Sequence, residues 1–214
     1  MQKQPGHALS TGQIHASLAP FGVKLSEEQI EWFRKYLDLL IYWNRTVNLT
    51  ATDDPEEIVG RHFGESIFAL SIIAMPHGRL ADVGSGAGFP GLPLKIASVG
   101  LDVLLMEPNL KKCAFLAELV AQTGLSGISV ARMRYEEYSS AGKKFDFIVS
   151  RALGNYKALL RWARNVLEEK GKVILWLGAE DSVSVSKSRE WEWEAPFLIP
   201  GSRRRVVLVG RPKT

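Results

Sequence analysis

One short stretch, residues 80–91, limits what this chain can fold into. It reads LADVGSGAGFPG, an apolar run that leads into four glycines within eight residues. Glycine adopts positive φ angles and has no side chain to keep a ligand at a distance. Such a pattern is typical of a buried strand that turns tightly beside a nucleotide-like ligand. We therefore expect a strand, a ligand-binding loop and then a helix from Leu92 to Ala97.

The sequence after this loop alternates between strand-like and helix-like patterns. Apolar runs predict further strands and periodic segments predict helices: strands at 101–106, 128–131, 145–150 and 172–177, helices at 110–123 and 155–168. After Ala179 the alternation stops, and two apolar segments flank Pro200-Gly201 as an antiparallel hairpin. Near-continuous apolar strands that alternate with helices predict an α/β fold with a mostly parallel sheet covered on both faces.

The sequence before residue 79 shows helical patterns only. Ser26 and Gln29 form a capping box, and the apolar spacing after them predicts a helix to about Asn44. Asp54-Pro55 starts a second helix that ends before the Pro-His-Gly sequence at 76–78. We therefore expect an N-terminal helical cap, residues 1–78, followed by a ligand-binding domain, residues 79–214.

Composition and charge limit the class of protein. The net charge is +4, and residues 170–214 carry nine basic and five acidic side chains, which suits an anionic partner such as nucleic acid without requiring one. No apolar run approaches the ~20 residues that a membrane helix needs. Residues 1–10 show no apolar signal-peptide region, and Cys113 is the single cysteine. We expect a cytoplasmic protein with no membrane contact and no metal site.

The glycine loop is compatible with two ligands. Residues 86–91 match the G-x-G-x-x-G pattern of dinucleotide-binding folds, which keeps an NAD-dependent oxidoreductase as an alternative. In the other frame, Asp82 precedes three alternating glycines, a pattern that resembles the first motif of class I S-adenosylmethionine methyltransferases. S-adenosylmethionine carries an ammonium and a sulfonium that an acid can complement. Glu107, after the second strand, fits either ligand as an acceptor for ribose hydroxyls.

Residues after the third and fourth strands are also candidates, since ligands bind at the carboxyl ends of parallel strands. Tyr135 and Glu136 lie where an adenine ring is expected, and Arg151 lies beside the expected reacting group. The segment SRALGN at 150–155 lacks the Pro-Pro-Tyr type of motif that accompanies amine methylation, and Cys113 is misplaced for a nucleophile. Guanine N7 needs neither a base nor a nucleophile, so alignment alone can drive its methylation. No catalytic residue is certain, and a non-catalytic RNA-binding assembly protein stays an alternative.

Longer motifs make a resemblance specific. The segments WNRTVNLTA, VGRHFGES, DVGSGAGFPGLPL and SRA, together with Glu107 and the lysine pair after it, look like the GidB (RsmG) family: residues 43–51, 59–66, 82–94 and 150–152. These bacterial enzymes methylate guanine N7 in 16S ribosomal RNA with S-adenosylmethionine. The resemblance implies a class I, Rossmann-like methyltransferase domain. It also implies 16S ribosomal RNA or a small-subunit particle as the partner, and we expect a monomer.

The resemblance implies roles for two groups of residues. One group would bind the cofactor: Asp82, Gly84, Gly86, Phe89, Glu107, Tyr135, Glu136 and Arg151. The other lies in the cap and would approach the substrate: Asn48, Arg61 and His62. A histidine on a helix is as often structural as functional, so both roles stay open for His62. Glu65 departs from the family, which usually has Asp before this serine.

Overall fold

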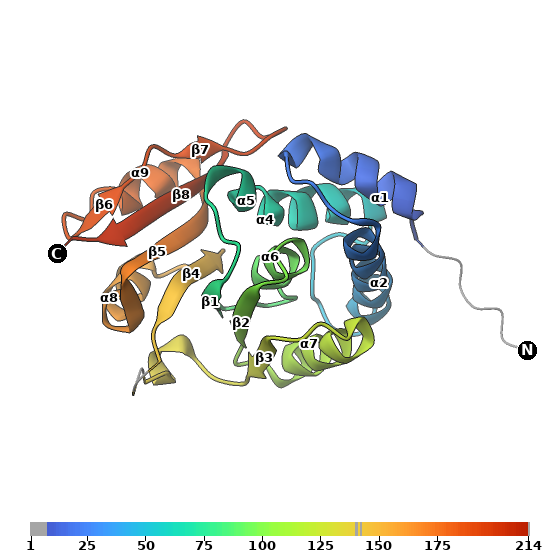
Figure 1. Ribbon diagram of the computed structural model, residues 1–214, viewed down its shortest axis with the longest axis horizontal. Helices are drawn as coiled ribbons and strands as arrows, with labels where there is room; N and C mark the ends of the chain where they lie inside the picture. Colours follow the sequence, from blue (N-terminus) through green and yellow to red (C-terminus); the bar gives the residue numbers. More distant parts are fainter. Residues whose placement is uncertain (1–7, 140, 142, 214) are drawn as a thin grey trace, which may run out of the picture.

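The computed structural model describes residues 8–139, 141 and 143–213, and a single sheet forms its centre (Figure 1). Its strands are β1 (Gly78–Val83), β2 (Leu101–Met106), β3 (Ile128–Ala131), β4 (Phe145–Arg151), β5 (Leu167–Gly178), β6 (Trp191–Trp193), β7 (Phe197–Leu198) and β8 (Arg205–Pro212). They are arranged in the order β3-β2-β1-β4-β5-β8-β6, and β7 also pairs with β8. Strands β1 to β5 are parallel, whereas β8 is antiparallel to β5, β6 and β7. The predicted mostly parallel α/β sheet with a C-terminal hairpin is confirmed.

This strand order determines where a ligand can bind. The chain leaves β1 toward β2 on one side and later returns to β4 on the other side. In open parallel sheets, such a reversal opens a crevice outside the carboxyl ends of the strands. The residues that follow Val83, Met106, Ala131 and Arg151 therefore gather at one edge of the sheet.

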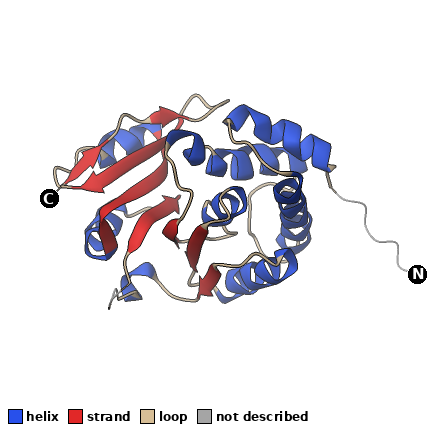
Figure 2. Ribbon diagram, viewed as in Figure 1, coloured by secondary structure: helices blue, strands red, loops and turns tan. Residues whose placement is uncertain are grey.

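Helices cover both faces of the sheet. They are α1 (Thr11–Leu18), α2 (Glu27–Asn44), α3 (Pro55–Glu57), α4 (Glu65–Ile67), α5 (Ala69–Ile72), α6 (Gly91–Ala97), α7 (Leu110–Thr123), α8 (Tyr156–Val166) and α9 (Ala179–Val185), with the 3-10 turns η1 (Ala19–Phe21) and η3 (Tyr135–Glu137) and the π-helical segment η2 (Ile58–Gly64). Figure 2 shows the helices of the N-terminal half on one side and the C-terminal strands on the other. None of the described helices is long and apolar enough to cross a bilayer.

Alternate strand residues pack into two different cores, as the period of a strand requires. Leu80 and Val103 belong to the cluster formed with α1, α2, α6 and α7. Ala81 and Val83 belong to the opposite cluster, formed with α8. Because α2 of the cap contributes to the first cluster, the cap packs on the sheet through a continuous core. The division at residue 78 stays a prediction.

The predicted caps form and attach α2 to the rest of the fold. The Ser26 hydroxyl accepts a hydrogen bond from the Gln29 backbone N–H (3.2 Å), and the Gln29 side chain accepts one from the Ser26 N–H (2.7 Å). The Gln29 amide also donates to the carbonyl of Ile96 at the end of α6 (2.8 Å). Asn109 caps α7, which ends at Gly124 with φ of 68°.

The helices differ from the prediction in three places. Helix α6 begins at Gly91, one residue before the expected Leu92. The helix predicted to reach residue 168 ends at Val166, because buried Leu167 pairs with Phe145 and starts β5. Helix α9 was not predicted at all. It buries only Ser182 and Val185, so its sequence carries no clear apolar period.

Candidate functional site

The glycine loop after β1 is held against the end of β2. Gly84, Gly86 and Gly88 have φ angles of 72°, 59° and 96°, which favour glycine. The backbone N–H groups of Gly84 and Ser85 donate to the carbonyl of Met106 at 3.0 and 3.1 Å. A Cβ on Gly88 would lie 2.6 Å from Leu92, so the loop also packs too closely for a side chain there. The predicted tight turn is confirmed.

Glu107 links this loop to the start of α7. Its carboxylate accepts one hydrogen bond from the Gly86 N–H (2.9 Å) and another from the Asn109 N–H (2.8 Å), one on each oxygen. The residue is 5 % exposed. A carboxylate offers about four lone-pair positions, so each oxygen can still accept a further donor. Glu107 therefore both orders the loop and presents acceptors at its surface.

Asp82 lies beneath the loop and is fully buried. Its Oδ2 accepts a hydrogen bond from the Gly91 N–H (3.0 Å) and so fixes the start of α6. Its Oδ1 is buried without a hydrogen-bond partner in the described part of the chain. Burial raises the pKa of Asp82 to about 7 against the opposing effect of the hydrogen bond from Gly91. Asp82 thus supports the loop from below.

A cavity of about 450 Å³ opens between this loop and the segments that follow β2, β3 and β4. It is lined by Gly84, Met106, Glu107, Pro108, Met133, Arg134, Tyr135, Glu136, Leu153, Gly154 and Asn155. Its volume lies within the ~300–1,000 Å³ typical of small-molecule sites. A Cβ on Gly84 would lie in ordinary van der Waals contact with Leu153, at 3.5 Å, so a side chain longer than alanine's would extend into this space. Four of the predicted cofactor residues, Gly84, Glu107, Tyr135 and Glu136, meet in this cavity, which we name the Glu107 cavity.

Tyr135 forms an aromatic wall of the Glu107 cavity. Its ring packs edge-on against Trp162 of α8, with centroids 5.2 Å apart and an interplanar angle of 70°. Burial, with Glu136 as a hydrogen-bond partner, raises the pKa of Tyr135 to about 12. The phenol therefore stays neutral at physiological pH. Glu136 itself is exposed at the mouth of the cavity.

Arg151, at the end of β4, contacts the cap. Its guanidinium donates to the carbonyl of Arg61 (3.1 Å) and hydrogen-bonds His62 Nδ1. The His62 ring stacks on Phe89 with centroids 4.9 Å apart, and the guanidinium lies 5.5 Å from the Phe89 centroid. Phe89 also packs against Tyr36 and is absent from the lining of the Glu107 cavity. The structure therefore brings Arg61, His62, Phe89 and Arg151 together beside that cavity.

His62 is electrically neutral in this arrangement. Burial, together with the positive charges of Arg151 and Arg61, lowers its pKa to about 3. A neutral imidazole has one ring nitrogen free to accept, so Nδ1 can receive the hydrogen bond from Arg151. Burial also lowers the pKa of Arg151, although a guanidinium keeps its charge in proteins. His62 thus orients a cation.

A second cavity, of about 240 Å³, lies between η2, the carboxyl ends of β4 and β5, and the start of β8. It is lined by Arg61, Glu65, Arg151, Ala152, Tyr156, Trp176, Leu177, Gly178, Asp181, Ile199 and Arg205. Arg205 binds the buried Glu65 carboxylate through Nε at 2.9 Å and through a terminal nitrogen at 2.7 Å. The Trp176 indole N–H donates to the Glu65 carbonyl (2.6 Å). We name this space the Glu65 cavity.

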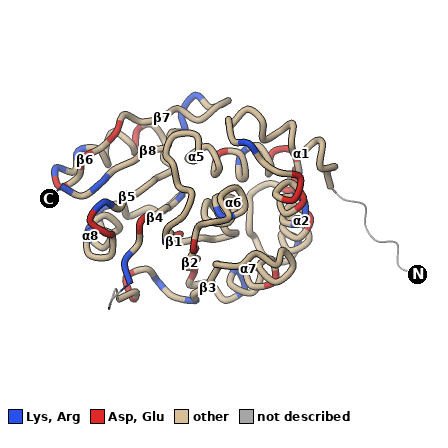
Figure 3. Tube along the Cα trace, in the orientation of Figure 1, with Lys and Arg blue, Asp and Glu red and all other residues tan. Residues whose placement is uncertain are grey.

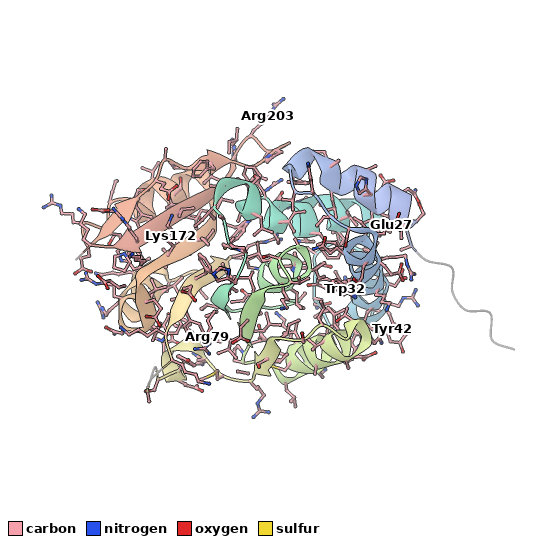
Figure 4. All side chains as sticks on the ribbon, viewed as in Figure 1. Glu27, Trp32, Tyr42, Arg79, Lys172 and Arg203 are labelled. Carbon is pink, nitrogen blue, oxygen red and sulfur yellow. The ribbon has the colours of Figure 1, made fainter. Side chains whose placement is uncertain are left out.

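Sequence reasoning missed the roles of Glu65, Trp176 and Arg205 in this cavity. Arg205 stands 140 residues from Glu65, and no local pattern connects them. The replacement of the family's Asp by Glu65 keeps the carboxylate and its ion pair. Arg203 and Arg204 are exposed, and Arg203 lies at the outer end of the turn before β8 (Figure 4). Of the three consecutive arginines 203–205, only Arg205 therefore lines this cavity.

Asn48 is not brought to the other predicted residues. It is exposed in the loop after α2 and lines neither the Glu107 cavity nor the Glu65 cavity. Asn44 organises this loop instead, because its Oδ1 accepts hydrogen bonds from the N–H groups of Leu49 (2.8 Å) and Thr50 (2.9 Å). The asparagine whose contacts explain the loop is thus four residues before the predicted one.

The basic excess of the C-terminal region is partly neutralised. Figure 3 shows acidic and basic residues together along the C-terminal strands. Arg211 pairs with Glu192, and Lys172 pairs with Glu194 at 3.2 Å. The rings of Trp191 and Trp193 stack 5.6 Å apart on β6, which pairs with β8. Among the described residues, no group of three or more His, Cys, Asp or Glu could hold a metal ion.

Comparison with known proteins identifies the family. The model of the family described as "GidB: rRNA small subunit methyltransferase G" matches residues 29–194. The chain belongs to this family. A GidB relative from Chromobacterium violaceum, named ribosomal RNA small subunit methyltransferase G, is 37 % identical over 196 residues, which cover 90 % of this chain and 93 % of the relative. A protein of the same name from Xylella fastidiosa is 38 % identical over 179 residues, covering 81 % and 83 %.

Solved structures support the fold in the same way. The ribosomal protein L11 methylase from Lactobacillus delbrueckii subsp. bulgaricus is similar with a TM-score of 0.59 at 17 % identity, over 72 % of this chain and 80 % of that chain. The sheet is that of the class I S-adenosylmethionine methyltransferases. The resemblance to GidB is confirmed, and the chain is a methyltransferase. The oxidoreductase alternative, which rested on residues 86–91 alone, finds no support in these comparisons.

Proposed function

We propose that this protein transfers a methyl group from S-adenosylmethionine to N7 of a guanine in 16S ribosomal RNA, either free or in a small-subunit particle. Membership of the GidB family supports this reaction. The observation that carries it to particular residues is the Glu107 cavity, whose lining residues 153–155 follow the half-buried Arg151 along the chain. We also propose that the protein acts as a cytoplasmic monomer, with residues 1–78 as a cap on the domain of residues 79–214.

The residues of the Glu107 cavity fit the cofactor. The Glu107 oxygens keep lone pairs that can accept from two ribose hydroxyls. The apolar wall of Met133 and Tyr135 suits an adenine ring, and Gly84 leaves room for close approach of the backbone. Asp82 lies outside the lining of this cavity and supports the loop that would hold the cofactor. When bound, S-adenosylmethionine supplies an electrophilic methyl group on a sulfonium.

On the substrate side, the reaction needs residues that position the guanine and does not need residues that activate its N7 atom. Guanine N7 already carries a lone pair, so orientation toward the methyl group can supply the acceleration. The Nδ1 atom of His62 is hydrogen-bonded to Arg151, and the imidazole is neutral. His62 therefore suits the role of an orienting group and not that of a base. Arg61, Arg151 and Arg205 line the Glu65 cavity and provide positive charge for an RNA backbone. In this proposal the cap closes the site from the side opposite the sheet.

Methyl transfer to ribosomal particles tests the proposal. Small-subunit particles and free 16S ribosomal RNA are prepared from cells that lack the protein and are incubated with it and isotope-labelled S-adenosylmethionine. Digestion and mass spectrometry should then detect N7-methylguanosine at a single position. Binding of S-adenosylmethionine without transfer to either substrate would favour the assembly-protein alternative. Binding of NADH without binding of S-adenosylmethionine would favour the oxidoreductase.

A further inference from the structure

The segment 152–156 separates three hollows of the molecule. A groove of about 880 Å³ between α8 and α9 shares Ala152, Tyr156 and Asp181 with the Glu65 cavity. The same groove shares residues 153–155 with the Glu107 cavity. The segment 152–156 therefore borders all three hollows. Asp181 of α9 lies on the wall that the groove and the Glu65 cavity have in common.

Asp181 is the available carboxylate on this wall. The Glu65 cavity has two carboxylates in its lining, and Glu65 is bound by Arg205 at 2.7 Å. Asp181 is exposed, and its side chain takes part in no hydrogen bond or ion pair found among residues 8–139, 141 and 143–213. The cavity is also lined by three arginines, whose guanidinium groups can only donate hydrogen bonds: Arg61, Arg151 and Arg205. A ligand that presents N–H donors here has Asp181 as its free anionic acceptor.

Guanine has the matching distribution of donors and acceptors. N7 and O6 are acceptors on one side of the base, and N1–H and the 2-amino group are donors on the other. If N7 faces the methyl group, the donor edge points away from the Glu107 cavity. Adenine presents an acceptor at N1 and has no 2-amino group, so it cannot offer two adjacent donors to a carboxylate. Resting on the proposed function, we propose that Asp181 accepts hydrogen bonds from N1–H and the 2-amino group of the target guanine and selects this base.

Tyr156 supports this placement. It lines both the groove and the Glu65 cavity together with Asp181. Burial raises the pKa of Tyr156, and the nearby Asp181 charge raises it further, so the phenol stays protonated beside the carboxylate. An aromatic face beside a hydrogen-bonding acceptor is the combination with which proteins commonly hold an unstacked base. In this placement the Tyr156 ring stacks on the base, and the Asp181 carboxylate accepts hydrogen bonds from its donor edge.

Variants at Asp181 test the proposal against a neighbouring control. Asp181→Asn and Asp181→Ala are compared with Glu180→Gln, because Glu180 is an exposed acid of the same helix that lines neither hollow. We expect kcat/KM for methyl transfer to small-subunit particles to fall roughly 10- to 100-fold in the Asp181 variants, the range of a good bidentate base contact. Glu180→Gln should stay close to wild type. S-adenosylmethionine affinity and thermal unfolding should be unchanged in all three.

Nucleotide inhibitors separate base recognition from a structural effect. Guanosine monophosphate and inosine monophosphate differ only in the 2-amino group and are used as competitors of the particle. Wild type should be inhibited more strongly by the guanosine nucleotide, and Asp181→Ala should lose this preference. Wild-type kcat/KM in Asp181→Ala, or a preserved preference despite lower activity, would overturn the assignment while leaving the proposed function intact. Absence of methyl transfer by the wild-type protein would overturn both.

Discussion

The site has two walls that are built in different ways. The glycine wall, residues 82–91 with Glu107, is held by carboxylates that accept backbone N–H groups 21, 9 and 2 residues away. The arginine wall, formed by Arg61, His62, Glu65, Arg151 and Arg205, is held by contacts between residues 89 to 140 positions apart. The first wall is therefore completed within one continuous segment, from β1 through α6 to the end of β2. The second forms only when the cap and the hairpin have docked on the sheet.

This difference separates the two tasks of the enzyme. A wall of ordered backbone groups is preorganised for one fixed ligand, which suits a cofactor shared by many methyltransferases. A wall of charged side chains from the cap, β4 and β8 suits an anionic substrate, because it presents three arginine side chains to one cavity. Stability and function are also coupled at the arginine wall, since the same contacts attach the cap and the hairpin. Substitutions in the glycine wall should therefore mainly change cofactor binding, whereas substitutions in the arginine wall should also change stability.

The largest effect is expected from a side chain in the glycine wall. Gly84→Leu would fill the space beside Leu153, where even a Cβ comes within 3.5 Å. We expect loss of detectable S-adenosylmethionine binding by calorimetry and loss of methyl transfer. Gly124→Leu is the matched control, because Gly124 has a similar φ of 68° and no atom within 4 Å of a Cβ. It should carry the backbone strain of about 1–2 kcal/mol without loss of binding. Equal binding by both variants would remove Gly84 from the cofactor site.

The next effect concerns the ion pair that closes the arginine wall. The side chain of Glu65 is 7 % exposed whereas that of Arg205 is 42 % exposed, so the two partners should not be equivalent. Arg205→Met leaves a buried carboxylate without its partner and should lower the free energy of unfolding by about 2–4 kcal/mol. Glu65→Gln leaves Arg205 with access to water and should cost only about 1 kcal/mol.

Urea unfolding of the two single variants and the double variant measures this asymmetry. The double variant should be more stable than Arg205→Met alone, because the uncompensated charge is gone. S-adenosylmethionine affinity should change little in any of them, since the pair lies outside the Glu107 cavity. A larger loss for Glu65→Gln than for Arg205→Met would contradict the burial argument.

The glycine wall could be predicted from the sequence because its contacts are local. Gly84, Gly86 and Glu107 lie at the ends of two adjacent apolar strands, and parallel strands bring their carboxyl ends together. The same reasoning correctly placed Tyr135 after β3. Most of the sheet followed from apolar runs, and the error at Leu167 arose because pairing with Phe145 overrode a helical pattern.

The arginine wall could not be derived in this way. Nothing in the local sequence shows that Glu65 pairs with Arg205 or that the Trp176 indole reaches the Glu65 carbonyl. The family resemblance indicated Arg61, His62 and Arg151, but the contact between His62 and Arg151 depends on how the cap docks on β4. Asn48 was indicated in the same way, but it is exposed and lines neither cavity. Residues that depend on docking are thus the ones that sequence patterns miss.

The two walls should also respond to pH in opposite directions. The pKa of His62 is lowered from 6.5 to about 3, so between these values the unfolded chain binds a proton that the folded protein does not, and stability rises with pH. The pKa of Asp82 is raised from 3.8 to about 7, so there the folded protein holds the proton, and stability falls as pH rises. Each slope is at most about 1.4 kcal/mol per pH unit, and they oppose each other in wild type.

Single variants should reveal the two slopes. Between pH 4.5 and 6, Asp82→Asn should become more stable relative to wild type as pH rises, because only the His62 contribution remains. His62→Gln should show the reverse, because the Asp82 contribution remains. The free energy of unfolding in urea at three pH values in this window is the measurement. If the free energy of unfolding has the same pH slope in wild type and in both variants, the pKa values of Asp82 and His62 are not shifted by burial as proposed.

The smallest effect on stability is expected at Arg61, where the arginine wall faces solvent. Its side chain pairs with Glu57 one helical turn away, and exposed pairs of this kind contribute little to stability. Arg61→Gln keeps the backbone carbonyl that accepts the hydrogen bond from Arg151, so the wall should stay assembled and thermal unfolding should barely change.

If Arg61 contacts an RNA phosphate, its loss should raise KM for the particle and reduce the salt dependence of binding by about one counterion. Glu57→Gln removes the same ion pair but keeps the cation, so it should not weaken RNA binding. Equal effects of the two variants on KM would mean that the ion pair between Arg61 and Glu57 matters and that Arg61 makes no contact of its own with RNA.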